Sequence, residues 1–364
     1  MTAAELHKEA FVLDSHCDTP SQILRLRDLS LDNDHAHVDF PKLKRGGVDG
    51  AFFALYVPAS LDADADAAMR YTESLFSAVQ NSLESNADKA VLTKSYQEAL
   101  ANKKNGLFSV FLGLENGSPI GTCLENIGSL YERGVRYMTL CHSGNNEICD
   151  SCATKQKRWN GLSPFGREVV KEMNRLGMLV DVSHISDASF YDVLECSQKP
   201  VVATHSCCWS LVDHPRNMTD DMIRSLASSG GVMQINFYPL FIDSSFKHVL
   251  AGSGIMERGE QIESEFIADP GDMQKREAWN RIQDELKALS RPSFRLIADH
   301  IDHAVELAGI EHVGIGSDFD GIEVTPEGLE NIGMMPVLFD ELRSRGYTES
   351  DLAKIAGDNF FRIL

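Results

Sequence analysis

The sequence predicts an α/β fold, namely a (β/α)8 TIM barrel built from the whole chain. Eight short segments rich in apolar and β-branched residues alternate with amphipathic segments along the 364 residues, as strands alternate with crossover helices in such barrels. Seven of these segments end at a polar residue, as expected where the carboxyl ends of parallel strands form one rim. The strands are predicted at 11–15, 48–57, 107–114, 134–141, 180–184, 201–205, 231–237 and 312–318.

The first predicted strand ends at His16 and Asp18, and the second is stopped by Pro58. Residues two apart on an extended chain point to the same side, so His16 and Asp18 form a candidate metal-ligand pair. The stretch 65–100 is rich in Ala, Leu, Glu and Lys and is predicted to be one helix.

The third strand runs into Glu115, a carboxylate that leaves an apolar strand for a glycine-containing turn. A crossover helix at 120–133 leads to the fourth strand, which ends at His142. The loop 143–164 that follows is long, and long loops in compact domains are often lids or binding elements. A helix is predicted next, at 165–176.

The fifth and sixth strands, VDVSH and VVATH, stop at His184 and His205. The amphipathic stretch 185–199 between them predicts a crossover helix. Parallel neighbours place both strand ends at the same edge, so the two imidazoles should be neighbours in space. Together with the other strand-end residues, this pair favours a metal-dependent active site over unrelated structural histidines.

Asn236 and Asp318 end the seventh and eighth strands. Between these strands, 238–291 is predicted to be an insertion that is mostly helical from Gly271 onward, and the tail 329–364 is predicted to be helical. Both are treated as parts of one barrel domain.

The bulk composition excludes several classes of partner. The net charge of −20 argues against nucleic acid and anionic membranes, since both require a basic face. The N-terminus lacks the apolar core of a signal peptide, and no stretch approaches the ~18 apolar residues of a membrane span. The sequence therefore predicts a cytoplasmic protein with no membrane partner. Without export, the eight cysteines should be reduced, and Cys149-x-x-Cys152 with Cys141 upstream is only weak support for a metal clip.

The chain resembles the membrane (renal) dipeptidase family of zinc metallopeptidases. The matching segments are DSHCDTP (14–20), GLEN (113–116), TLCHS (139–143), GLSPFG (161–166), DVSH (181–184), HS (205–206), PRN (215–217) and GSDFDG (316–321). They extend from the first strand to the last, so the resemblance covers nearly the whole chain and implies a barrel of the metal-dependent hydrolase type. Ser15 and Cys17 depart from the family's commoner residues, which puts the substrate fit near Cys17 in doubt but leaves both ligand positions intact.

The resemblance implies two Zn²⁺ ions per subunit, with ligands His16 and Asp18 at one ion, His184 and His205 at the other, and Glu115 bridging both. It also implies that His142, Arg216 and Asp318 contact the substrate, and that Glu115, His142 and Asp318 take part in catalysis. The expected reaction is hydrolysis of a dipeptide, including one with a C-terminal D-residue, by a hydroxide that bridges the metals. The oligomeric state stays open, with a homodimer as one candidate.

Two alternatives to a dipeptidase are considered. An amidohydrolase acting on cyclic amides would share the barrel and metals but would commonly use a carboxylated lysine at the fourth strand, where this chain has His142. A non-catalytic metal-binding protein would need neither Arg216 nor Asp318. Turnover of a small dipeptide panel separates these alternatives.

Overall fold

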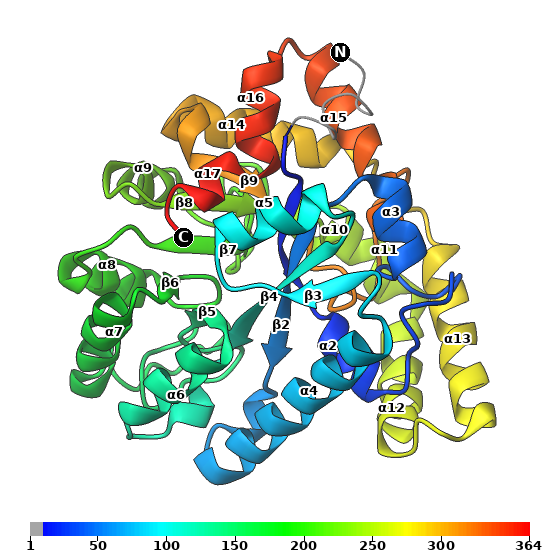
Figure 1. Ribbon diagram of the computed structural model, residues 1–364, viewed down its shortest axis with the longest axis horizontal. Helices are drawn as coiled ribbons and strands as arrows, with labels where there is room; N and C mark the ends of the chain where they lie inside the picture. The colour runs from blue at the N-terminus through cyan, green and yellow to red at the C-terminus, as the bar shows by residue number, and fades with distance from the viewer. Residues whose placement is uncertain (1–9) are drawn as a thin grey trace.

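The computed structural model describes residues 10–364, and its centre is a ring of eight parallel strands (Figure 1). The ring is nearly closed, because Cys17 at the end of the first strand pairs with Phe319, just beyond the last. The predicted (β/α)8 barrel is therefore confirmed. Its strands, in order around the ring, are β1 (Leu13–Cys17), β2 (Gly50–Tyr56), β4 (Phe108–Glu115), β5 (Val135–Thr139), β6 (Leu179–Asp181), β7 (Val202–Ser206), β8 (Val232–Ile235) and β9 (Val313–Ile315).

One further strand interrupts the stretch 65–100, which was predicted to be a single helix. That prediction is wrong: α4 (Ala65–Ser85) is followed by β3 (Ala90–Leu92) and then by α5 (Tyr96–Lys104). β3 pairs with residues 108–110 of β4, ahead of the residues of β4 that pair with β5. Three residues of strand depend on this distant partner, which local helix propensity cannot reveal.

The helices that follow the barrel strands lie outside the ring, and several of them begin at a residue whose side chain caps the helix. α7 (Pro164–Leu176) begins after Ser163, whose side chain accepts a hydrogen bond from the Gly166 N–H, and ends at Gly177 in the left-handed conformation. The other helices of the outer layer and its connections are α2 (Thr19–Leu24), α3 (Phe40–Gly46), α6 (Glu125–Arg133), α8 (Asp187–Cys196), α9 (Asp220–Ser228) and α14 (Arg295–Ala308). Within residues 10–364, no helix combines the length and the apolar character needed to cross a bilayer.

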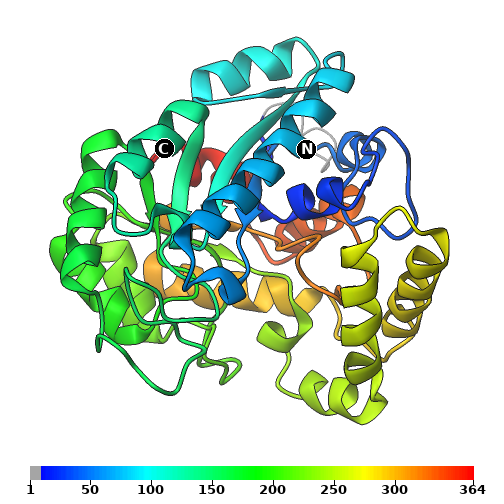
Figure 2. The ribbon, with the colours of Figure 1, turned by 90° about the horizontal axis from the view of Figure 1, so that it is seen from below.

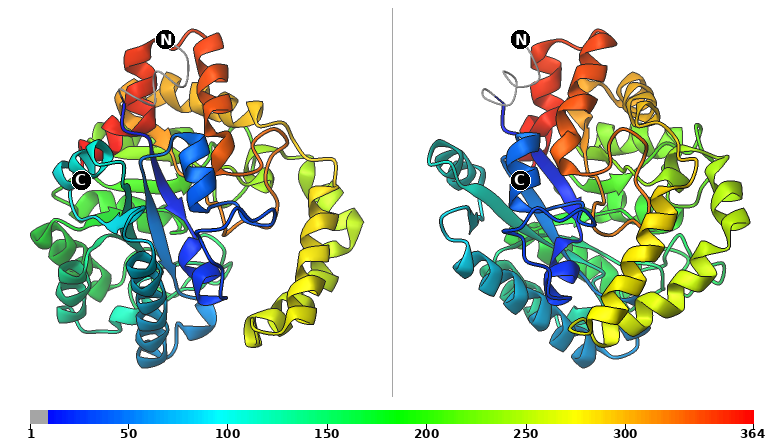
Figure 3. Two further views of the ribbon diagram at one scale, coloured as in Figure 1. Left: turned by 45° about the vertical axis from the view of Figure 1, so that its right-hand side comes forward. Right: turned by 90° about the vertical axis from the view of Figure 1, so that its right-hand side faces the viewer.

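Four helices fill the segment between β8 and α14: α10 (Pro239–Ile242), α11 (Phe246–Ser253), α12 (Ile255–Ala268) and α13 (Met273–Lys287). α12 and α13 lie side by side at one edge of the molecule, as Figures 2 and 3 show. They bury their own small core, which includes Phe266, Trp279 and Ile282. The sequence indicated helical structure only from Gly271 onward, but helices begin well before that residue.

The last residues of the C-terminal helical segment close the amino end of the barrel. α15 (Met335–Ser344) and α16 (Glu349–Ala353) lead through a π-helical turn to α17 (Asn359–Phe361). The ring of Phe360 lies 5.0 Å from that of Phe52, and the ring of Phe52 stacks on that of Phe111 at 4.9 Å, measured between ring centroids. Aromatic side chains thus fill this end of the ring, and polar side chains gather at the carboxyl end.

Candidate active site

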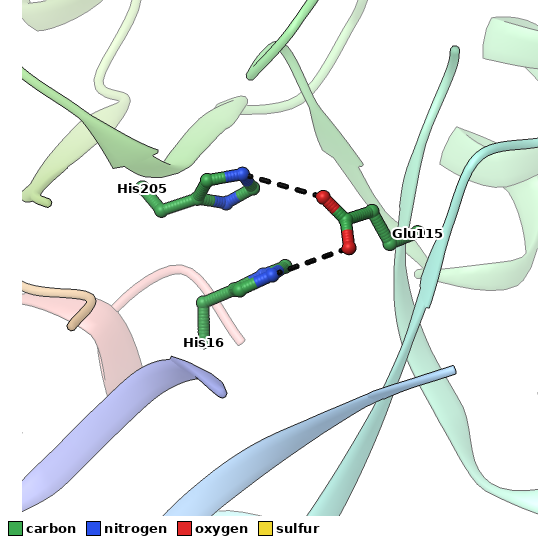
Figure 4. Close-up of side chains that lie close together, drawn as sticks. All are labelled: His16, Glu115 and His205. Carbon is green, nitrogen blue, oxygen red and sulfur yellow. Dashed lines mark ion pairs between the residues drawn. The ribbon is translucent and has the colours of Figure 1, made fainter. Parts of the chain in front are cut away.

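The carboxylate of Glu115, the last residue of β4, directs one oxygen toward His16 and the other toward His205 (Figure 4). Its Oε2 is 3.5 Å from Nε2 of His16. Its Oε1 is 3.1 Å from Nε2 of His184 and 3.4 Å from Nε2 of His205. The two Nε2 atoms of His184 and His205 are only 2.8 Å apart, so the histidines predicted to be neighbours are neighbours. One carboxylate therefore faces imidazole nitrogens from the ends of three other strands.

Asp18 and Asp318 complete the group around His16. Oδ2 of Asp18 is 3.6 Å from Nε2 of His16, and ligand atoms of His16, Asp18 and Asp318 all lie within 4.8 Å of one another. Gly321 has no side chain here for a reason: a Cβ atom would lie 2.1 Å from Oδ2 of Asp18 and 2.9 Å from Oδ1 of Asp318. Asn236 donates to Oδ2 of Asp318 at 2.8 Å and orients that carboxyl group.

Left-handed backbone conformations at non-glycine residues gather at this rim. Asn116, His184, Asp318 and Asp320 have φ angles of 80°, 69°, 65° and 68°. Such conformations are costly and persist where surrounding contacts determine them, typically at functional sites. The carboxylate of Asp320 supplies such contacts, because it accepts hydrogen bonds from Arg27 at 2.6 Å and from the Thr19 hydroxyl at 2.9 Å.

Three buried polar atoms at the rim have no hydrogen-bond partner among residues 10–364. They are Nε2 of His16, Oδ1 of Asp18 and Nε of Arg216. A buried polar atom without a partner costs about 1–3 kcal/mol, so native proteins rarely retain one without a function for it. These atoms are therefore available to a cation or a substrate.

The electrostatics of the rim favour binding of a cation. Burial raises the pKa of Asp18 to about 6 and that of Asp318 to about 7, and the nearby carboxylates of Glu115 and Asp18, respectively, add to the effect. Burial, assisted by Arg216, lowers the pKa of His184 well below its ordinary value, and burial does the same for His205. Neutral imidazoles offer lone pairs, and crowded carboxylates are stabilised by a positive ion.

Arg216 and His142 lie beside these donors. Nη2 of Arg216 donates to the carbonyl oxygen of His205 at 2.8 Å. Nε2 of His142 is 3.8 Å from Oε1 of Glu115, and its ring centroid is 4.1 Å from that of His184. Burial, together with the positive charge of Arg216, lowers the pKa of His142 to about 3, so this imidazole is neutral and can donate a hydrogen bond. All eight strand-end residues singled out from the sequence, and Arg216 with them, thus lie at one rim.

Tyr56 was not singled out from the sequence, although it ends β2, the strand for which no polar end residue was named. Its ring meets the ring of His142 edge-on, with centroids 4.8 Å apart. Tyrosine at the end of an apolar strand, one residue before Val57-Pro58, is the signal that could have identified it. Tyr238, which follows β8, is a second tyrosine that was not singled out from the sequence. Its hydroxyl donates to Oε2 of Glu323 at 2.8 Å.

The long loop 143–163 is attached to the rim by backbone contacts. The Ser151 hydroxyl donates to the carbonyl of His142 at 2.5 Å, and the Cys152 N–H donates to the carbonyl of His184 at 2.8 Å. No cysteine belongs to a group of side chains that could hold a metal ion anywhere in residues 10–364, so the metal clip at Cys149 and Cys152 is not supported.

The sequence profile of the membrane dipeptidase family, peptidase family M19, matches residues 1–364. The chain belongs to this family. The resemblance found from the strand-end motifs is thereby confirmed, and the chain is a dipeptidase of a metallopeptidase family.

Relatives of the membrane dipeptidase family match over most of their length. The chain is 32% identical to the dipeptidase verJ of Clonostachys rogersoniana, over 90% of this chain and 75% of that protein. It is 30% identical to the dipeptidase aclJ of Aspergillus oryzae, over 94% of this chain and 73% of that protein.

Two solved structures share the fold. The probable dipeptidase PvdM of Pseudomonas aeruginosa superposes with a TM-score of 0.81 at 24% identity, over 99% of this chain and 96% of that one. A metallopeptidase of Rhodobacter sphaeroides, solved with a phosphinate mimic of the dipeptide L-Ala-D-Ala, gives a TM-score of 0.77 at 23% identity, over 97% and 98%.

Proposed function

We propose that this chain is a binuclear zinc dipeptidase. In this proposal His16 and Asp18 hold one ion, His184 and His205 hold the other, and Glu115 is shared. The observation that carries the proposal is the orientation of the Glu115 carboxylate, which turns Oε2 toward His16 and Oε1 toward His184 and His205. A carboxylate with no cation to bridge would have no reason to turn one oxygen toward the neutral imidazoles of His184 and His205.

The chemistry of these side chains fits zinc. Imidazole nitrogen and carboxylate oxygen are both zinc ligands. Nε2 of His16 and Oδ1 of Asp18 are buried without hydrogen-bond partners, and an ion beside them would supply the missing contact. Zinc ions bound by these residues would lower the pKa of a bound water toward ~7 and so would supply the nucleophile for hydrolysis at neutral pH.

The remaining rim residues suit a dipeptide. Arg216, already held by the carbonyl of His205, would pair with the C-terminal carboxylate of the substrate. His142 would donate a hydrogen bond to the scissile carbonyl oxygen as negative charge develops there. Asp318 would accept a proton from the attacking water and deliver it to the leaving amine, a role suited to a carboxyl group whose pKa is raised by burial.

We extend the proposal to dipeptides with a C-terminal D-residue, the class that the ligand of the Rhodobacter sphaeroides enzyme mimics. The amidohydrolase alternative is less favoured, because β5 (VRYMT) contains no lysine that could be carboxylated to bridge two metals.

The test combines metal analysis with turnover. Protein dialysed against metal-free buffer should retain two zinc ions per chain and should cleave L-Ala-L-Ala and L-Ala-D-Ala at comparable rates. Active protein with one metal would contradict the binuclear site, and strict rejection of L-Ala-D-Ala would contradict the extension to D-residues. Cleavage of a cyclic amide such as dihydrouracil, without cleavage of any dipeptide, would favour the amidohydrolase.

A further inference from the structure

A buried carboxylate that the proposed mechanism does not use lies directly behind the rim. Asp181, the last residue of β6, is fully buried and accepts four hydrogen bonds. Its Oδ1 accepts from the backbone N–H groups of Ser183 at 3.0 Å and Thr204 at 2.9 Å. Its Oδ2 accepts from the hydroxyls of Thr139 at 2.5 Å and Thr204 at 2.7 Å. The hydroxyl hydrogen of Thr204 is therefore directed at Asp181.

The same hydroxyl oxygen touches a histidine of the proposed metal site. Oγ1 of Thr204 is 2.8 Å from Nδ1 of His205. A hydroxyl group has one hydrogen, and Thr204 uses it toward Asp181, so toward His205 the oxygen can only accept. Nδ1 of His205 must therefore carry the hydrogen, and a neutral imidazole then has a lone pair on Nε2, the atom that faces Glu115 at 3.4 Å.

We propose that Asp181 and Thr204 are positioning residues that select the tautomer of His205 with hydrogen on Nδ1, and so prepare its Nε2 atom to bind a metal ion. The inference rests on the proposed function, because His205 is a ligand only in a metal-dependent enzyme. Neither residue touches substrate: Asp181 acts through Thr204, and Thr204 acts through His205.

The relay should affect one metal position more than the other. Nδ1 of His16 has a partner of its own, the hydroxyl of Tyr137 at 2.8 Å, and its distance to Oγ1 of Thr204 is 3.5 Å. His205, by contrast, depends on Thr204 alone for a contact to Nδ1 within the described residues. Loss of the Thr204 hydroxyl should therefore weaken binding of the ion held by His184 and His205, and it should leave binding of the ion held by His16 and Asp18 unchanged.

Thr139 provides a matched control. It is as fully buried as Thr204 and donates to the same oxygen of Asp181, but in the described part of the chain its hydroxyl contacts no histidine. Thr139→Val and Thr204→Val therefore remove the same group from the same carboxylate, and only the second removes the acceptor for His205. Thr204→Ser keeps the hydroxyl and should behave like wild type.

Zinc affinity measured by competition with a chelator is the first readout. In Thr204→Val we expect the more weakly bound zinc ion to have an affinity about 10- to 100-fold below that in wild type. This is the usual effect of removing a hydrogen-bond partner of a metal-ligating histidine. Thr139→Val and Thr204→Ser should stay close to wild type. Equal weakening in Thr139→Val and Thr204→Val, or wild-type affinity in Thr204→Val, would overturn the proposal.

The second readout is the tautomer itself, observed by ¹⁵N NMR of the imidazoles in metal-free protein. Wild type should show hydrogen on Nδ1 of His205. Asp181→Asn should reverse this, because the two backbone donors keep the amide oxygen at the Oδ1 position and the amide N–H then donates toward Thr204. Hydrogen on Nε2 of His205 in wild type would refute the relay even if every variant failed to fold. Since this measurement needs no turnover, it is independent of whether the zinc-loaded wild type cleaves dipeptides.

Discussion

Replacement of Arg216 by alanine is expected to abolish the preference of the enzyme for a free C-terminal carboxylate. The guanidinium group is oriented by contacts within the protein. Its Nη2 donates to the His205 carbonyl oxygen at 2.8 Å, its central carbon lies 5.5 Å from the ring centroid of Phe241, and its buried Nε has no hydrogen-bond partner within residues 10–364. A substrate carboxylate would thus meet a fixed donor, with little additional ordering of the side chain.

The magnitude follows from the kind of bond. A hydrogen bond to a charged group contributes about 1.5–3 kcal/mol, and about 1.4 kcal/mol corresponds to a factor of ten in rate. Wild type should therefore cleave L-Ala-L-Ala with a kcat/KM roughly 10- to 150-fold above that for the C-terminal amide of the same dipeptide. Arg216→Ala should lose this factor by slowing the free dipeptide, while Arg216→Lys, which offers a point charge but no planar pair of donors, should recover only part.

The assay compares kcat/KM for the two substrates in each variant, with zinc content measured in parallel because Arg216 also holds the backbone of His205. Arg224→Ala is the control, since Arg224 is a largely exposed arginine on α9 that pairs with Asp221 and does not reach the rim. If Arg216→Ala slowed dipeptide and amide equally while keeping its zinc, Arg216 would not be the carboxylate anchor. The restriction to dipeptides would then have to come from elsewhere, with the loop 143–163 as the next candidate.

Three further predictions concern protons, metal and pH. Asp318→Asn should keep fold and zinc but lose ~10²–10⁴ in kcat, as removal of a general acid–base does, whereas loss of zinc would make Asp318 a ligand. Removal of zinc by a chelator should lower the melting temperature as well as abolish hydrolysis, because the buried ligands then lack a cation, and added zinc should restore both; an unchanged melting temperature would argue against a metal at this rim. Burial lowers the pKa of His300 to about 4, and its Nδ1 accepts from the Cys208 N–H at 3.0 Å, so the folded state holds it neutral. His300 binds a proton more readily in the unfolded chain than in the folded one. The free energy of unfolding should therefore be highest above pH ~6.5 and should fall as the pH drops toward ~4. Urea unfolding at pH 7 and 5 should show a smaller loss in His300→Gln than in wild type, and an equal loss would refute this cause.

Much of the fold could be predicted because each barrel strand has a recognisable local sequence pattern. Buried parallel strands form short, apolar, β-branched runs, and each of the eight predicted runs overlaps a barrel strand. β3 escaped prediction because three residues of strand carry no such signal and pair with one end of β4. Helices α11 and α12 were missed because their buried apolar residues belong to a small separate core that they share with α13, so they do not show the periodic pattern of a helix that packs on the barrel.

Some residues of the candidate site could likewise be identified from the sequence, and others could not. His16, Glu115, His184 and His205 could be named from the sequence because parallel topology alone brings the carboxyl ends of strands to one rim. Tyr56 was overlooked because a tyrosine after an apolar strand resembles a packing residue until its contact with His142 is known.

Local sequence pattern indicated which strands end in polar side chains, and the constant direction of parallel strands indicated that these ends meet. How the atoms at these ends face one another follows only from the folded arrangement of the strands. That Glu115 turns one oxygen to His16 and the other to His184 and His205 depends on the register of strands far apart in the chain. That Asp181 acts on His205 through Thr204 depends on hydrogen-bond direction, because one hydroxyl hydrogen can serve only one acceptor at a time and its position in space decides which.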